Sequence, residues 1–152
     1  MMRLKEKEQD KAFALAVFRD CQYATLSTVN PDGTPYGVIV STVVVDGAIC
    51  FHGANEGKKV DNIKANPNVS ISGVKHTKLL PERFTTEYES AIANGSCVSV
   101  EDKGEKIKII RAICEKYAPT SMGEFDVMVG RLLDVTKIFK IQIATITGKA
   151  NY

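Results

Sequence analysis

Between residues 23 and 53 the chain alternates strand-forming runs with tight turn signals, and this alternation constrains the fold more than any other feature. Asp46-Gly47 is a strong two-residue hairpin turn, and NPDGTP is a dense turn signal. The runs between the turns are rich in β-branched residues, which favour strands. The pattern therefore predicts three successive antiparallel strands, at 23–29, 36–45 and 48–53.

The rest of the chain adds three predicted strands and four predicted helices. Asn94-Gly95 indicates a bulge inside one of these strands, and we expect residues 77–86 to form a loop. Helical spacing, the cap Asp10 and the capping-box pair Asp102 and Glu105 indicate helices. The further strands are predicted at 68–76, 88–100 and 137–150, and the helices at 10–21, 57–66, 102–117 and 125–132.

Six meandering strands with few helices to cover them favour a sheet that curls into a barrel. The 152 residues suit a single domain with a sizeable core, and no linker or repeat interrupts residues 1–152. We therefore predict a mainly β domain, a six-stranded antiparallel barrel with peripheral helices.

Composition excludes several classes of function. A net charge of +2 is too balanced for a typical nucleic-acid-binding protein. No apolar run approaches the ~20 residues that span a bilayer, and the N-terminus lacks the apolar core of a signal peptide, so we expect a cytoplasmic protein. The four cysteines show no C-x-x-C spacing, and His52 and His76 lie far apart, so we expect no metal site.

The segment FHGANEGKKVDNIKANP, residues 51–67, carries the clearest chemical signal. Lys58 and Lys59 open a predicted helix, where the partial positive charge of the helix start disfavours cations unless an anion lies nearby. Glycines and free N–H groups at a helix start suit a phosphate, although the spacing is not that of a Walker A loop. A solvated lysine pair fits the same pattern. His52, at a strand end, suits either a ligand contact or a structural hydrogen bond.

Longer motifs give the chain a family resemblance. In order they are YATLSTVNPDGTPYGVIVS, the Asp-Gly hairpin, FHGANEGKKVDNIKANPNVSIS, the YES strand, the capped helix and a terminal ITGKA. From about Arg19 to Ala150 the chain resembles the flavin-binding split barrels of the pyridoxamine 5′-phosphate oxidase-like superfamily. Within it, the chain is most similar to the Nim-type nitroimidazole-resistance reductases.

The resemblance implies an FMN cofactor held at the interface of a homodimer. Lys58 and Lys59 would bind the FMN phosphate, and Ser90 would approach from the partner subunit. Apolar residues near Leu79, Leu80 and Phe84, with the strand at 88–100, would form part of the dimer contact. The remaining cofactor contacts would be the backbone of Val38, Val40 and Ser41, and the residues Phe51 and His52.

The chain also departs from the true pyridoxamine 5′-phosphate oxidases. Tyr36 and Ser41 stand where those enzymes carry Arg and Lys, and the chain has no Trp, so we do not expect vitamin B6 oxidation. The resemblance implies an FMN-dependent oxidoreductase that passes electrons from NADH or NADPH to a small acceptor such as a nitroaromatic. His52 would donate a proton or orient the substrate. Two alternatives stay open: a non-catalytic flavin-storage or flavin-sensing protein, and a split barrel that binds haem or a deazaflavin.

Overall fold

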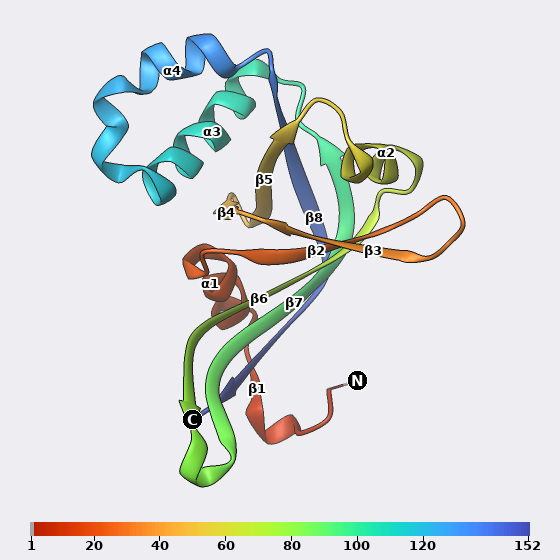
Figure 1. Cartoon of the computed structure of the whole chain (residues 1–152), viewed down its shortest axis with the longest axis vertical. Coiled ribbons are helices and arrows are strands. Elements are labelled where there is room, and N and C mark those ends of the chain that lie inside the picture. Colours follow the sequence, from red (N-terminus) through yellow and green to blue (C-terminus); the bar gives the residue numbers. More distant parts are fainter. Residues whose placement is uncertain (1) are drawn as a thin grey trace.

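One antiparallel sheet dominates the computed structural model, which describes residues 2–152 (Figure 1). The strands follow the order β3-β2-β6-β7-β8-β5-β4, and the two-residue β1 pairs with β8 outside this path. The mainly β fold with peripheral helices is confirmed, with seven strands along the path where we expected six. The strands are β1 (Glu8–Gln9), β2 (Ala24–Val29), β3 (Pro35–Val40), β4 (Thr42–Val45), β5 (Ala48–Ala54), β6 (Asn68–Leu80), β7 (Thr85–Ser99) and β8 (Thr136–Asn151).

The additional strand arises because the strand predicted at 36–45 is broken at Ser41. Its first part, β3, pairs with β2, while its second part, β4, pairs with β5. β3 and β4 therefore form the two opposite edges of the sheet, although one residue separates them in the chain. A sheet whose edges are joined by a single residue must curl until the edges meet, which produces a split barrel.

The prediction of a loop at residues 77–86 is wrong. β6 continues to Leu80, and the chain returns through a short 3-10 turn, Pro81–Arg83, into β7 at Thr85. The pairing shifts register between Lys75 and Lys78, so the two strands continue as a bent hairpin arm beyond the barrel (Figure 1). The threonines, charged residues and proline of this segment are typical of a loop, and cross-strand pairing overrides that local composition.

The helices begin and end where the sequence indicates. The Asp10 carboxylate accepts a hydrogen bond of 2.8 Å from the Phe13 N–H, and the Asp102 carboxylate accepts one of 2.8 Å from Glu105. No helix in residues 2–152 is both long enough and apolar enough to cross a membrane. The α-helices are α1 (Lys11–Asp20), α2 (Lys58–Ala65), α3 (Lys103–Tyr117) and α4 (Phe125–Leu132).

The Asn94-Gly95 bulge is confirmed by a register shift between β7 and β8 at this point. A Cβ atom at Gly95 would lie 2.1 Å from the Gln142 carbonyl oxygen, which no side chain permits. The close approach of the two backbones explains why glycine occupies this position.

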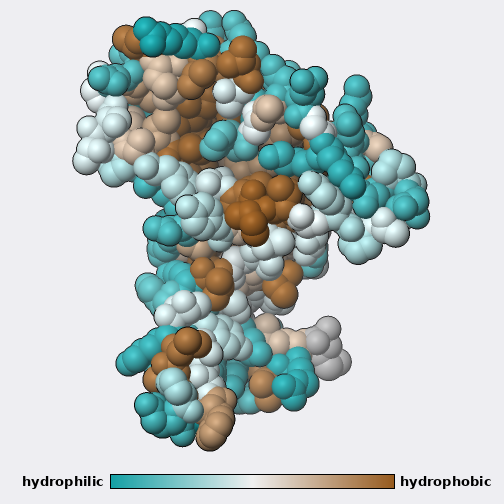
Figure 2. All heavy atoms as spheres, viewed as in Figure 1, coloured by the Kyte–Doolittle hydropathy of each residue, from teal (hydrophilic) through white to brown (hydrophobic). Residues whose placement is uncertain are grey.

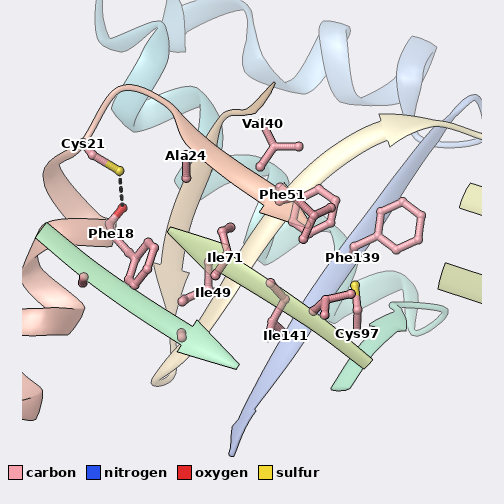
Figure 3. Packing of buried hydrophobic residues seen from close by; sticks show 14 of the residues in the cluster. Phe18, Cys21, Ala24, Val40, Ile49, Phe51, Ile71, Cys97, Phe139 and Ile141 are labelled. Atoms are coloured by element: carbon pink, nitrogen blue, oxygen red, sulfur yellow. Dashed lines mark hydrogen bonds between the residues drawn. The ribbon is translucent and has the colours of Figure 1, made fainter. Parts of the chain in front are cut away.

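Two hydrophobic clusters fill the molecule. The first lies inside the barrel, where Phe51 and Phe139 stack with ring centroids 5.2 Å apart (Figure 3). The second lies on the other face of β5 and β8, where Cys50 and Ile138 pack beneath α3 and α4. Figure 2 shows apolar side chains gathered between these two helices.

The C-terminal end of α3 forms hydrogen bonds with the backbone where the two sheet edges meet. The Lys116 ammonium donates hydrogen bonds of 2.6 Å to each of the Cys21 and Thr42 carbonyls. The Tyr117 hydroxyl accepts one of 3.0 Å from the Thr42 N–H and donates one of 2.7 Å to the Gln22 carbonyl. Burial lowers the pKa of Lys116. This clamp, formed by Lys116 and Tyr117, ties α3 to the start of β4.

We predict that Lys116→Met lowers the free energy of unfolding by about 1.5–3 kcal/mol, because backbone carbonyls lose a charged donor. Urea denaturation followed by circular dichroism measures the change. Lys108→Met is the matched control on the same helix, since Lys108 pairs with Asp46 at the exposed surface. Such surface pairs contribute less than about 1 kcal/mol. An equal loss of unfolding free energy in the two variants would contradict the stabilising role of Lys116.

Candidate functional site

The site is built where β5 ends and α2 begins. Gly57, with φ 129°, turns the chain into the helix in a conformation that favours glycine. Val60 and Ile63 bury one face of α2 in the barrel core. The buried Asn62 side chain donates to Thr28 Oγ1 at 3.1 Å and to Asn30 Oδ1 at 3.0 Å, which fixes α2 to the β2–β3 hairpin. The first turn of α2, with its two lysines, is therefore held rigidly.

The two lysines extend in different directions. The Lys58 ammonium lies 4.6 Å from the centroid of the Tyr36 ring. The Lys59 ammonium lies over Gly53, 3.2 Å from where a Cβ atom would stand, so glycine makes room for this side chain. Within residues 2–152 neither lysine forms an ion pair with a carboxylate. Hydrogen bonds from Thr34 and, more weakly, the charge of Lys58 lower the pKa of Asp32, so Lys58 has a carboxylate nearby without forming an ion pair with it. Lys59 has no carboxylate partner in the chain described.

Side chains alternate along a strand, and Phe51 and His52 accordingly point to opposite faces of β5. Phe51 is fully buried in the barrel core, whereas part of the His52 side chain is exposed. Burial by neighbouring atoms, and secondly the charge of Lys59, lower the pKa of His52 below its usual 6.5. The imidazole is therefore mostly neutral at pH 7.

His52 borders a small pocket of about 130 Å³ between the sheet and the helices α3 and α4. Its other polar groups are the Thr136 hydroxyl and the Cys114 thiol. Burial raises the pKa of Cys114, which keeps the thiol protonated near neutral pH. The apolar walls are Ile110 and Ile113 from α3, and Met128, Val129 and Leu132 from α4.

The predicted backbone contacts lie where β3 ends at the meeting of the two sheet edges. Val40 is buried and Val38 packs against the barrel core, so their side chains point inward. Ser41 stands between β3 and β4, beside the clamp on Thr42. The contact of this backbone with a cofactor stays a prediction.

Ser90 lies elsewhere in the same chain. On β8, His52 faces Ile138 and Ser90 faces Lys149, eleven positions further along the strand. At roughly 3.3 Å per residue this is a path of about 36 Å. Ser90 instead lines a hollow on the outer face of the sheet with Ile39, Val74 and Ile92. The chain brings His52 and Lys59 together and keeps Ser90 apart, so the contact of Ser90 from a partner subunit stays a prediction.

Sequence reasoning missed the residues that hold and border this site. Asn62 stands between Val60 and Ile63, and a polar residue between two apolar positions is a weak signal of a buried hydrogen bond. Lys116 and Tyr117 continue an ordinary amphipathic helix, and no local pattern marks them. The pocket walls on α3 and α4 were predicted only as helical stripes.

A comparison with known protein families shows to which family the chain belongs. The family model of pyridoxamine 5′-phosphate oxidase matches residues 11–149. The chain belongs to this family. The resemblance drawn from its motifs is therefore confirmed, while none of the curated proteins matches the sequence significantly.

Solved structures with the same fold are distant in sequence. A candidate 5-nitroimidazole antibiotic resistance protein from Bacteroides thetaiotaomicron is 21% identical, with a TM-score of 0.75 over 93% of this chain and 84% of that one. A FAD-binding protein from Mesorhizobium loti is 20% identical, with a TM-score of 0.71 over 96% and 98% of the two chains. The FAD and haem binding protein from Mycobacterium smegmatis is 15% identical, with a TM-score of 0.82 over 95% and 73%. At these identities the likeness shows a shared fold.

Proposed function

We propose that this protein binds FMN and works as a flavin-dependent oxidoreductase of a small acceptor such as a nitroaromatic. The observation that carries the proposal is the pair Lys58 and Lys59, which open α2 without a carboxylate partner in residues 2–152. An anionic ligand would stabilise two cations that the helix dipole disfavours. A flavin phosphate is such an anion.

The residues around the lysines fit this group. Gly53 leaves room for Lys59, and nothing within 4 Å would meet a Cβ atom at Gly57, so a ligand can approach this backbone closely. Lys58, Lys59 and the first N–H groups of α2 would hold the phosphate. The bound flavin would supply the redox chemistry by taking electrons from NADH or NADPH and passing them to the acceptor.

His52 is the residue we propose to act on the substrate. Its imidazole is mostly neutral at pH 7, so it can both accept and donate a hydrogen bond. The structures of a FAD-binding protein and of a candidate 5-nitroimidazole resistance protein with the same fold support the flavin and the nitroaromatic, respectively. Tyr36 and Ser41 supply no cation, which argues against a vitamin B6 substrate.

We predict that the protein binds FMN at least tenfold more tightly than riboflavin, because each charge-assisted hydrogen bond to the phosphate contributes about 1.5–3 kcal/mol. Flavin fluorescence quenching measures both affinities. Lys58→Ala and Lys59→Ala should each weaken FMN binding and leave riboflavin binding nearly unchanged. Lys64→Ala, in the last turn of the same helix, is the control. Equal affinities for FMN and riboflavin would place the phosphate elsewhere.

A second prediction separates a reductase from a flavin-storage protein. With FMN bound, the protein should oxidise NADH or NADPH rapidly once a small nitroaromatic is added. His52→Ala should retain FMN and lower the rate per bound flavin by about tenfold or more, as expected for a positioned proton donor or acceptor. His76→Ala is the control, because the His76 side chain is exposed and lies on β6, at the start of the arm. Slow turnover in the wild-type protein would favour storage or sensing.

We also propose a homodimer that brings Ser90 of one subunit to the flavin of the other. The outer face of β3, β2, β6 and β7 exposes Ile39 at 62%, Ile92 at 49% and Val74 at 48% of their surfaces. Ser90 lies among these side chains. An apolar sheet face around this residue supports a contact between subunits.

Light scattering at micromolar concentration should give the mass of a dimer. Ile92→Glu should produce monomers, because burying a carboxylate in an apolar interface is unfavourable. Val127→Glu is the control, since Val127 is 60% exposed on α4, away from this face. A monomeric wild-type protein that still holds FMN would contradict the proposal.

A further inference from the structure

The pocket between α3, α4 and the sheet carries no charged side chain. Its lining is apolar except for His52, Thr136 and Cys114. Burial lowers the pKa of His52 and raises the pKa of Cys114, so both groups are mostly neutral near pH 7. A charged ligand would lose its water in this pocket without gaining a counter-ion. The lining therefore selects an uncharged molecule.

The volume of the pocket limits the size of the molecule that it can bind. Its volume of about 130 Å³ is close to that of an apolar protein cavity that admits benzene, roughly 150 Å³. Drug-sized ligands need pockets of roughly 300 Å³ or more. The three-ring isoalloxazine and a phosphorylated pyridine both exceed this space, so a single small ring remains.

The position of His52 links the pocket to the lysine site. His52 borders the pocket, and the charge of Lys59 acts on the same imidazole. Within residues 2–152 His52 forms neither a hydrogen bond nor an ion pair. Only burial and the charge of Lys59 shift its pKa. Its imidazole is thus free to bond a polar substituent on a ring held by the apolar walls.

We propose that this pocket binds the electron acceptor as a single uncharged ring, with His52 bonding its polar substituent and the walls of α3 and α4 selecting its size and charge. The proposal rests on the proposed function only in naming the bound molecule an acceptor. Binding itself needs no flavin. Val129 on α4 and Cys114 on α3 then determine which acceptors fit, since each borders the pocket from a different helix.

The test compares nitrobenzene with benzoate, which have nearly the same shape and differ by one negative charge. Isothermal titration calorimetry at pH 7.5 should show nitrobenzene binding at least tenfold more tightly than benzoate, both with and without FMN. In NMR spectra nitrobenzene should shift the methyl signals of Ile113, Met128 and Val129. Equal affinities, or shifts confined to other residues, would overturn the proposal.

Filling the pocket provides the second arm of the test. Val129→Phe should weaken nitrobenzene binding at least tenfold, while Val127→Phe, the same change on the exposed face of α4, should leave it unchanged. Cys114→Leu fills the pocket from α3 and decides the matter if Val129→Phe fails to fold. Undiminished binding in folded Val129→Phe or Cys114→Leu protein would refute the assignment.

The outcomes also separate this inference from the proposed function. Nitrobenzene binding in the pocket, together with equal affinities for FMN and riboflavin, would support acceptor binding in the pocket and reject phosphate binding by Lys58 and Lys59. Selective FMN binding without nitrobenzene binding would support the phosphate site and reject acceptor binding in the pocket.

Discussion

The joining of the two sheet edges at Ser41 is the constraint on which the rest of the structure depends. β3 and β4 lie at opposite ends of the strand order, and a single residue connects them, so the sheet can satisfy both pairings only by curling. The bend leaves backbone groups near Thr42 that need partners away from the ladder. Lys116 and Tyr117 supply them, and in doing so they dock the end of α3 against the barrel. The position of α3, and hence the wall of the His52 pocket, follows from this closure.

Several lysines of the chain are bound by other groups of the protein. Lys75, Lys108 and Lys140 pair with carboxylates, and Lys116 is bound by backbone carbonyls. Lys58 and Lys59 have neither, although each is held in place, one against an aromatic ring and the other above a glycine. Two lysines at a helix start that form no ion pair have a physical reason if a ligand provides the negative charge. We propose a flavin phosphate as that ligand.

Most of the fold could be predicted because its signals are local. The Asp46-Gly47 turn has positive φ angles at both residues, as its sequence indicates, and the caps Asp10 and Asp102 form the expected hydrogen bonds. The alternation of side chains along β5 correctly separated Phe51 from His52. The break at Ser41 was missed because β-branched residues continue on both sides of it. The arm beyond Lys75 was missed because pairing between β6 and β7 overrides a composition typical of loops.

By itself, the sequence determined most of the strands, the helix ends, the bulge at Gly95 and the segment that carries Lys58 and Lys59, since each depends on neighbours within a few residues. Only the tertiary structure decided which strand edges meet, that Lys59 lies beside His52, and that Ser90 stands far along β8 from both. It alone placed α3 and α4 over His52 to form an uncharged pocket. These relations join residues that are distant in the chain. They arise from the closure of the sheet and the burial of apolar surface, which no local pattern encodes.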